Sequence, residues 1–293
     1  MKELNKFGVV KTNYPLKRLT TFKIGGPAKA VIWVKKEALL ADLIYYLKKH
    51  SCPYYLLGNG SNTLALDSGY NGIVIKLALK NIVWQSEDSD IFLKIGAGLK
   101  MSHLLNLSIK KGWTGLEFMA GIPATVGGAI ASNAGAFGES IGEKTKKIKI
   151  FSENKILWIN WENKMYNYRH TQLSPETILL SAQINLNIST PQNVKALIKH
   201  YFHKKLTSQP LFSSSAGCVF KNPPNISAGY LIEKAGLKGE KIGGAKISEK
   251  HANFIINTGG AKASDVLGLI ELIQEKIEKY NNIKLEPEIK LVQ

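Results

Sequence analysis

Two glycine-rich stretches of the chain contain residue types that could hold a phosphate-bearing ligand. The first, Gly58-Asn59-Gly60-Ser61-Asn62, follows a short apolar run. Backbone N–H groups in such a turn can face an anion, and the Ser61 and Asn62 side chains add donors. The dinucleotide-binding fingerprint needs three spaced glycines that open a helix, so this stretch does not match it. Taken alone, the stretch is explained equally well by an ordinary tight turn.

The second glycine-rich stretch runs from Gly112 to Gly142 and holds eight of the 26 glycines in the chain. Its densest parts are residues 121–129 and 133–138, which carry no charged side chain. Small residues would let a flat ring system and a pyrophosphate lie directly on the backbone. Close packing of two strands through glycine would give the same composition. The presence of both stretches in one chain favours a ligand.

Three further positions have residue types suited to catalysis. Arg169 could hold a carboxylate through two parallel hydrogen bonds, although most single arginines form surface ion pairs. Cys218 lies close to Lys221, so it could be a reactive thiol or a small buried apolar residue. Glu288 lies near the C-terminus, in a predicted strand where a glutamate is usually solvated. None of these residues identifies a function by itself.

The elements that would position these residues can be predicted from apolar spacing and capping residues. Strands are expected at residues 28–34, 54–57, 72–77, 91–95, 147–151, 156–159, 177–186, 218–220, 253–257 and 285–291. Helices are expected at residues 37–50, 101–111, 191–206, 228–235 and 265–280. Ser264 is the expected cap of the last helix. The mixed order of helices and strands predicts an α+β fold.

The length and charge of the chain limit the classes of protein to which it can belong. Its 293 residues, of which 44% are hydrophobic, predict roughly two domains. The 39 Lys and Arg residues against 22 Asp and Glu give a net charge of +17. Such a charge attracts polyanions, which include nucleic acids, nucleotides and flavins. The lysines are spread along the chain, without the basic tail that is typical of nucleic-acid-binding arms.

Cysteine content and the N-terminal residues bear on cellular location. Cys52 and Cys218 are too few for a disulfide framework or a zinc site of paired cysteines, and no metal site is predicted. The first residues lack the apolar core of an export signal, so a cytoplasmic location is expected. Residues 118–138 are uncharged and long enough to cross a bilayer. Their proline, asparagine and glycines predict a buried loop instead of a membrane helix.

The order and spacing of these segments resemble those of one family. The motifs are Thr21-Phe22-Lys23-Ile24-Gly25-Gly26-Pro27, the Gly58–Asn62 turn, Gly121-Ile122-Pro123, Val126-Gly127-Gly128, Asn133-Ala134-Gly135, Tyr168-Arg169-His170, Ser215-Ala216-Gly217-Cys218-Val219-Phe220-Lys221-Asn222-Pro223 and Leu285-Glu286-Pro287-Glu288. From about Leu19 to Val292 the chain is similar to the UDP-N-acetylenolpyruvoylglucosamine reductases. Each motif is weak alone, whereas their order is specific.

The resemblance implies a two-subdomain FAD-binding domain of the vanillyl-alcohol-oxidase type and a C-terminal α+β substrate-binding domain. Residues 1–66 with the C-terminal strand 286–293 would form the first FAD subdomain, residues 67–198 the second, and residues 199–285 the substrate domain. The length is that of the compact class of the family, and a monomer is expected. Non-covalent contacts to FAD are expected from Gly58, Asn59, Gly60, Ser61, Asn62, Gly121, Ile122, Pro123, Gly127, Gly128, Asn133 and Gly135.

The reaction implied by the resemblance belongs to peptidoglycan precursor synthesis. NADPH would reduce FAD, and UDP-N-acetylglucosamine enolpyruvate would then be reduced to UDP-N-acetylmuramate. Arg169 matches an arginine that would hold the substrate carboxylate as it gains charge. Glu288 matches a glutamate that must be protonated to help a developing enolate. Substrate contacts are expected from Tyr168, Lys205, Gln209, Lys221 and Asn222.

Cys218 departs from the family pattern, because many members have serine at this proton-donor position. An ordinary thiol has a pKa of about 8.5, so it is mostly protonated at neutral pH and can donate. The substitution therefore bears on the pH optimum more than on the reaction.

Two other functions stay open at this point. Another flavin oxidoreductase could use the same FAD-binding scaffold, although such enzymes often tether FAD through His or Cys, and residues 112–142 contain neither. A basic nucleic-acid-binding protein would bind DNA or RNA with strong salt dependence and carry no chromophore. The C-terminal motifs favour the reductase, with no nucleic-acid partner and no membrane insertion.

Overall fold

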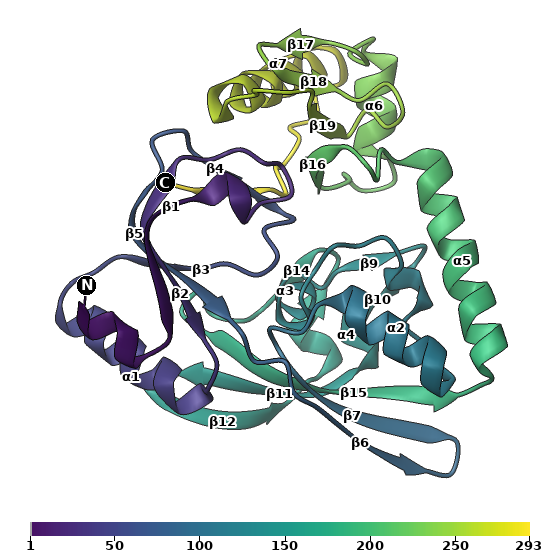
Figure 1. Ribbon diagram of the computed structural model, residues 1–293. Coiled ribbons are helices and arrows are strands. Elements are labelled where there is room, and N and C mark those ends of the chain that lie inside the picture. Colours follow the sequence, from purple (N-terminus) through teal and green to yellow (C-terminus); the bar gives the residue numbers. More distant parts are fainter. Residues whose placement is uncertain (1) are drawn as a thin grey trace. The chain divides into compact units, whose positions relative to one another are not determined.

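The computed structural model describes residues 2–293, which divide into two compact units (Figure 1). Unit 1 comprises residues up to 11, 31–59 and 73–204, and unit 2 comprises residues 12–30, 60–72 and 205–293. The chain therefore passes repeatedly from one unit to the other. The strands β1 (Val9–Pro15), β2 (Pro27–Val34) and β5 (Tyr70–Leu77) contribute residues to both units. With β3 (Tyr54–Leu56) they form a sheet of order β1-β2-β5-β3.

An antiparallel six-stranded sheet lies at the centre of unit 1. Its order is β12 (Lys155–Asn160), β11 (Thr145–Ser152), β15 (Ile178–Ile188), β7 (Asp90–Gly96) and β6 (Ile82–Glu87), and β8 (Trp113–Thr114) also pairs with β15. Alternate residues of β7, Ile91, Leu93 and Ile95, are buried, as expected for a strand with one face on a core. The same core includes residues of α2 (Met101–Lys111), α3 (Val126–Ala131) and α4 (Ile141–Lys144), which lie on one side of the sheet (Figure 1).

The apolar spacing of α2 explains why this segment is a helix. Met101, Leu104 and Leu105 are buried on one face. The helix ends at Gly112, whose φ of 71° is left-handed and costs glycine no Cβ clash. All five predicted helices are confirmed to within two residues at each end.

The remaining elements of unit 1 are mostly short. They are η1 (Lys2–Lys6), α1 (Glu37–Lys49), η3 (Glu117–Met119), β9 (Gly135–Ala136), β10 (Glu139–Ser140), η4 (Asn163–Met165), β13 (Tyr166–Asn167), β14 (His170–Thr171) and most of α5 (Pro191–Ser208). β9 pairs with β10, and β13 with β14, in two antiparallel hairpins. No helix within residues 2–293 is both long and apolar enough to cross a membrane.

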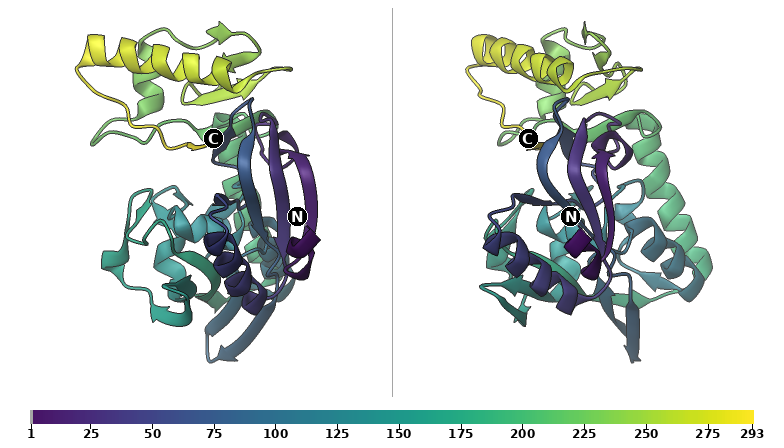
Figure 2. Two further views of the ribbon diagram at one scale, coloured as in Figure 1. Left: turned by 90° about the vertical axis from the view of Figure 1, so that its left-hand side faces the viewer. Right: turned by 60° about the vertical axis from the view of Figure 1, so that its left-hand side comes forward.

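Unit 2 contains a four-stranded antiparallel sheet and two helices. The strand order is β16 (Ser214–Cys218), β19 (Phe254–Asn257), β18 (Ala245–Ile247) and β17 (Lys241–Ile242). Helices α6 (Ala228–Lys234) and α7 (Ala263–Asn281) share a hydrophobic core with this sheet. Figure 2 shows α7, in yellow, beside the strands of this unit. The predicted apolar face of α7 is buried, as the spacing of its core residues requires. The other elements are η2 (Leu16–Arg18) and β4 (Thr63–Ala65), which pairs in parallel with β20 (Lys290–Val292).

Two predicted strands of unit 2 are wrong in position. The strand expected at residues 218–220 lies at Ser214–Cys218, because Phe220 has left the sheet and forms only an isolated bridge with Pro287. The strand expected at residues 285–291 is reduced to Lys290–Val292. Pro287 has no N–H to donate, so a regular ladder cannot continue through it.

The predicted cap of α7 is also wrong. The residue before the helix is Lys262, and Ser264 lies inside the first turn. The carboxylate of Asp67 accepts hydrogen bonds from the backbone N–H groups of Ala263, at 2.9 Å, and Ser264, at 3.3 Å. A residue far away in the sequence therefore caps this helix.

Candidate functional site

The turn from Gly58 to Asn62 leaves its backbone donors available. Among residues 2–293, no protein acceptor receives a hydrogen bond from the backbone N–H groups of these five residues. Gly60 has a φ of 68°, and a Cβ atom there would lie 2.2 Å from the carbonyl oxygen of Leu19. Only glycine fits at position 60. Successive unbonded N–H groups of this kind form a concave surface that binds anions.

The two predicted glycine-rich stretches contact each other in unit 1. The side-chain amide of Asn59 donates a 2.6 Å hydrogen bond to the carbonyl oxygen of Pro123. A Cβ atom on Gly58 would lie 3.1 Å from Oγ1 of Thr125 and 3.8 Å from the Cα atom of Gly128. Segments far apart in the sequence thus meet, as a shared ligand-binding cradle requires.

Lys76 on β5 places a cation beside this contact. Its ammonium group donates a hydrogen bond to the carbonyl oxygen of Gly58. Burial, and to a lesser extent the charge of Lys100, lowers the pKa of Lys76 to about 8. An anion bound at this turn would stabilise the charged form of the amine. No sequence motif marks Lys76, so it was missed by the pattern analysis.

Other residues predicted to contact the cofactor have structural roles that the geometry makes clear. A Cβ atom on Gly127 would lie 2.7 Å from the Cβ atom of Ala97, so this glycine allows α3 to pack closely beyond the end of β7. Asn133 accepts a 3.0 Å hydrogen bond from the N–H of Gly142 and donates one of 2.8 Å to the carbonyl oxygen of Asn167. The packing interpretation of the glycines therefore holds for part of the second stretch.

The other three predicted residues of this stretch, Gly121, Ile122 and Gly135, lie before and after α3. Gly121 has a left-handed φ of 79° and, with Ile122, joins η3 to α3. Gly135 begins β9, where a Cβ atom would lie 2.2 Å from the carbonyl oxygen of Glu139.

Arg169 occupies the turn of the β13–β14 hairpin in unit 1. Asn167 pairs with His170, so Tyr168 and Arg169 are the two turn residues. The φ of Arg169 is 55° and that of Tyr168 is not positive, so the left-handed residue is the second of the two, as in a type II turn. Its guanidinium carbon lies 5.8 Å from the centre of the Tyr168 ring. Asn133 holds the hairpin at Asn167.

Unit 2 brings together the segments that carry Cys218 and Glu288. The N–H of Glu288 donates a 2.7 Å hydrogen bond to the carbonyl oxygen of Val219, the residue after Cys218. The N–H of Lys221 donates a 3.0 Å bond to the carbonyl oxygen of Glu286. Cys218 and Glu288, which are far apart in the sequence, therefore lie on adjacent backbone segments.

The predicted substrate-contact residues of unit 2 lie along the same part of the chain. Lys205, near the end of α5, is only 2% exposed, and its carbonyl oxygen accepts a 2.7 Å hydrogen bond from the N–H of Gln209. Lys221 forms an ion pair with Glu286. The side-chain oxygen of Asn222 accepts a 3.0 Å bond from the N–H of Ala228, at the start of α6.

Asn253, just before β19, is a buried polar residue that no sequence motif marks. Its side chain is 2% exposed and makes two hydrogen bonds to the backbone of Phe220, accepting from the N–H at 2.9 Å and donating to the carbonyl oxygen at 2.8 Å. The only sequence signal is an asparagine at the edge of an otherwise apolar strand.

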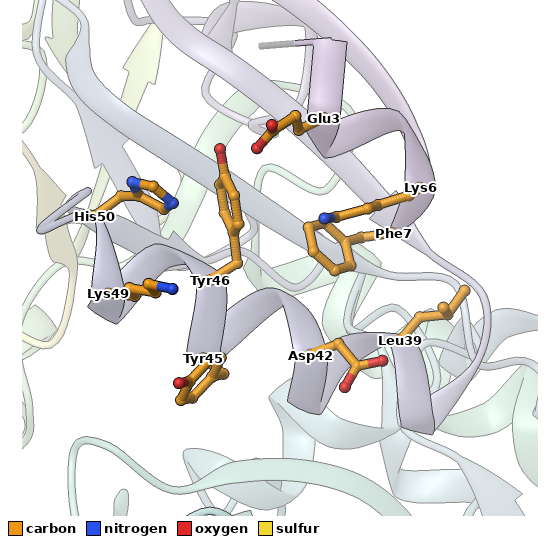
Figure 3. Close-up of a pocket in the computed structure, with 9 residues that line it drawn as sticks. All are labelled: Glu3, Lys6, Phe7, Leu39, Asp42, Tyr45, Tyr46, Lys49 and His50. Atoms are coloured by element: carbon orange, nitrogen blue, oxygen red, sulfur yellow. The ribbon is translucent and has the colours of Figure 1, made fainter.

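A groove elsewhere on unit 1 contains none of the predicted site residues. Its volume is about 570 Å³, and it is lined by side chains of η1 and α1, by Phe7 after η1 and by His50 after α1 (Figure 3). The Tyr46 ring lies 5.5 Å from that of Phe7 and 4.4 Å from that of His50, measured between ring centres. These contacts pack the N-terminal residues on α1.

Comparisons with known proteins agree with the motifs. A model of the FAD binding domain matches residues 28–148, and a model of the UDP-N-acetylenolpyruvoylglucosamine reductase C-terminal domain matches residues 209–292. The reductase of that name from Caldanaerobacter subterraneus subsp. tengcongensis is 42% identical, over 100% of this chain and 96% of its own. The Bacillus subtilis reductase is 38% identical, over 97% of this chain and 94% of its own.

A solved structure has the same fold over nearly the whole chain. The UDP-N-acetylenolpyruvylglucosamine reductase from Thermus caldophilus gives a TM-score of 0.83 at 33% sequence identity, covering 97% of this chain and 98% of its own. This similarity and the FAD-binding match confirm the predicted α+β fold, with an FAD-binding domain of the vanillyl-alcohol-oxidase type and a C-terminal α+β substrate-binding domain.

Proposed function

The chain belongs to the UDP-N-acetylenolpyruvoylglucosamine reductase family, and we propose that Arg169, Cys218 and Glu288 are the residues that act on its substrate. It is an FAD-containing oxidoreductase that uses NADPH to reduce UDP-N-acetylglucosamine enolpyruvate to UDP-N-acetylmuramate in peptidoglycan synthesis. The expected cofactor, co-substrate and enzyme class are thereby confirmed. The observation that carries the residue assignment is the 2.7 Å hydrogen bond that pairs the Cys218 and Glu288 segments.

The glycine-rich turn has the donors that FAD requires. Its pyrophosphate is an anion, and the unbonded N–H groups of Gly58 to Asn62 can bind it. The hydrogen bond from Asn59 to Pro123 brings the second predicted stretch beside this turn. These contacts support non-covalent FAD binding by Gly58, Asn59, Gly60, Ser61, Asn62 and Pro123. The order of the motifs is the ground on which Gly121, Ile122, Gly127, Gly128, Asn133 and Gly135 are proposed as further FAD contacts.

Bound FAD, once reduced by NADPH, would supply the hydride for C3 of the enolpyruvyl group, and the chain's own residues would stabilise the developing charge and deliver the proton. The guanidinium of Arg169 would hold the substrate carboxylate, on which negative charge develops. Glu288, as a carboxylic acid, would donate a hydrogen bond to the developing enolate. The thiol of Cys218 would give its proton to C2, leaving a thiolate that solvent reprotonates.

The substrate contacts are proposed from the same alignment of motifs. Tyr168, Lys205, Gln209, Lys221 and Asn222 would bind the sugar and the phosphates. Lys221 would have to exchange its ion pair with Glu286 for a substrate phosphate. Such an exposed pair contributes little stability, so the exchange costs little.

The proposal also covers the domain bounds, the oligomeric state and the cellular location of the enzyme. Residues 1–66 with 286–293, residues 67–198 and residues 199–285 would form the first FAD subdomain, the second FAD subdomain and the substrate domain. The enzyme would act as a monomer. It would work in the cytoplasm, where NADPH and nucleotide sugars are found.

Separating the two half-reactions tests the role of Cys218. In Cys218→Ala, NADPH should bleach the bound flavin at the wild-type rate, because this step needs no substrate proton. Reoxidation by the UDP-enolpyruvyl sugar should slow by roughly a hundredfold or more, the usual range for loss of a general acid. Stopped-flow absorbance of the two steps measures both rates.

Cys52→Ala is the matched control, since Cys52 is the only other cysteine and lies just after α1 in unit 1. It should leave both steps unchanged. If the flavin of Cys218→Ala is reoxidised at the wild-type rate, Cys218 is only a packing residue.

A further inference from the structure

The side chain of Asn253 extends the hydrogen bonding between β16 and β19 past the end of β16. The register of β16 and β19 pairs Ser215 with Ile256 and Cys218 with Phe254, with an irregularity between these pairs. Gly217 lies in this irregularity with a left-handed φ of 79°. Beyond Cys218 one more backbone bond forms, from the N–H of Val219 to the carbonyl oxygen of Asn253, and the side chain of Asn253 then makes two hydrogen bonds to Phe220.

Three hydrogen bonds connect Asn253 to the two residues after Cys218. Its amide bonds both backbone groups of Phe220, at 2.9 Å and 2.8 Å. Its own carbonyl oxygen accepts a 2.8 Å bond from the N–H of Val219. Because the side chain is 2% exposed, water does not readily replace these bonds.

The other side of the same segment holds Glu288. The carbonyl oxygen of Val219 accepts the 2.7 Å hydrogen bond from the N–H of Glu288, while the N–H of Val219 donates to Asn253. One peptide segment is therefore fixed on one edge by Asn253 and presents its other edge to Glu288. The Val219–Phe220 peptide thus has its carbonyl group on Glu288 and its N–H on the side chain of Asn253, and the two side-chain bonds of Asn253 are the ones that substitution can remove.

We propose that Asn253 is a positioning residue for proton delivery, which keeps Cys218 and Glu288 in register through Val219 and Phe220. This inference rests on the proposed function of Cys218. Asn253 touches neither substrate nor cofactor in this role. It acts by fixing the backbone on which the proton donor is carried, and displacing such a donor by 1 Å can cost about a hundredfold in rate.

The test uses the FAD-loaded enzyme with Asn253→Ala and Asn253→Asp. As a carboxylate, the aspartate variant can still accept from the N–H of Phe220 but has no donor for its carbonyl oxygen, so it gives a second measurement if the alanine variant does not fold. Both variants should retain FAD, and NADPH should reduce their flavin at the wild-type rate.

Reoxidation of the flavin by the UDP-enolpyruvyl sugar should slow roughly tenfold to a hundredfold. The pH profile of Cys218 alkylation by iodoacetamide should also shift, since the surroundings of the thiol change.

Asn257→Ala is the matched control. Asn257 lies on the same strand and makes three similar side-chain bonds, to the carbonyl oxygen of Phe22 and the N–H groups of Gly259 and Ala261. It should lower thermal stability without a selective effect on reoxidation or on the alkylation profile.

The results separate the two hypotheses. If Cys218→Ala slows reoxidation while both Asn253 variants reoxidise at the wild-type rate, the positioning role is wrong and the proposed function stands. If Asn253 and Asn257 variants lose stability and rate equally in both half-reactions, Asn253 has only a structural role. If Cys218→Ala reoxidises normally, the proton-donor assignment fails, and the positioning inference fails with it.

Discussion

The side-chain amide of Asn62 donates a 3.0 Å hydrogen bond to the backbone carbonyl oxygen of Glu288, 226 residues further along the chain. The carbonyl oxygen of Asn62 accepts a second 3.0 Å bond from the N–H of Lys290. The last residue of the glycine-rich turn therefore holds a proposed catalytic residue through its side chain. Its backbone N–H remains available for the cofactor.

Asn62→Ala should slow reduction of the UDP-sugar more than it weakens FAD binding. The variant loses the bond to Glu288 but keeps every backbone donor of the turn. We expect a roughly tenfold lower reoxidation rate with FAD affinity within about threefold of wild type. Fluorescence titration of the apoprotein with FAD and stopped-flow reoxidation measure the two effects. Ser61→Ala is the control. A large loss of FAD affinity in Asn62→Ala alone would show that its side chain serves the cofactor.

Lys76 should make the stability of the enzyme depend on pH in the alkaline range. The pKa of Lys76 is lowered to about 8 by burial and by Lys100, whereas an unfolded lysine has an ordinary pKa. Between about pH 8 and pH 10.5 the unfolded chain therefore binds a proton that the folded chain does not. Stability contributed by this group must rise with pH in that window, by at most about 1.4 kcal/mol per pH unit.

The comparison that isolates this group is wild type against Lys76→Met. Urea unfolding of the FAD-free protein, followed from about pH 7 to pH 10, should show the wild type gaining stability relative to the variant as pH rises. Lys100→Met should raise the pKa of Lys76 toward its ordinary value, because the repelling charge is removed, and should therefore narrow the pH range over which stability rises. Parallel pH profiles for wild type and Lys76→Met would contradict the lowered pKa.

Asp67 should stabilise unit 2 by capping α7. Its carboxylate bonds the N–H groups of Ala263 and Ser264 at the positive end of the helix. Asp67→Ala should lower the free energy of unfolding by about 1 kcal/mol, which thermal denaturation can detect. Ser264→Ala is the control and should have a much smaller effect. A larger loss of stability in Ser264→Ala than in Asp67→Ala would mean that Ser264, as predicted from the sequence, is the cap.

Sequence patterns predicted the elements whose signals are local. The apolar spacing of α2 and the stop at Gly112 lie within one short segment, and both are confirmed. The cap of α7 and the bonds of Asn253 could not be predicted, because their partners lie 196 and 33 residues away. A pattern along the chain carries no information about which distant donor will meet a given acceptor.

The site shows the same division between local and distant signals. Gly60 could be anticipated from its place in a glycine-rich turn, and the structure leaves no room there for a Cβ atom. The strand expected at residues 218–220 was misplaced because Phe220 pairs with Pro287 and with Asn253, and neither is near it in sequence. Motif order identified the family, whereas contacts such as Lys76 with Gly58 required the fold.

Cys218→Ser should remain active but change the pH dependence of reoxidation. Only the protonated thiol can donate to C2, and an ordinary thiol loses its proton near pH 8.5. The wild-type reoxidation rate should therefore fall as pH rises through the thiol pKa. A serine hydroxyl does not ionise in this range, so the variant should show no fall from that group. Flavin reduction by NADPH should have the same pH profile in both proteins, which provides an internal control. Stopped-flow reoxidation from about pH 6 to pH 10 measures the difference. Superimposable reoxidation profiles would show that Cys218 is not the group whose proton limits this step.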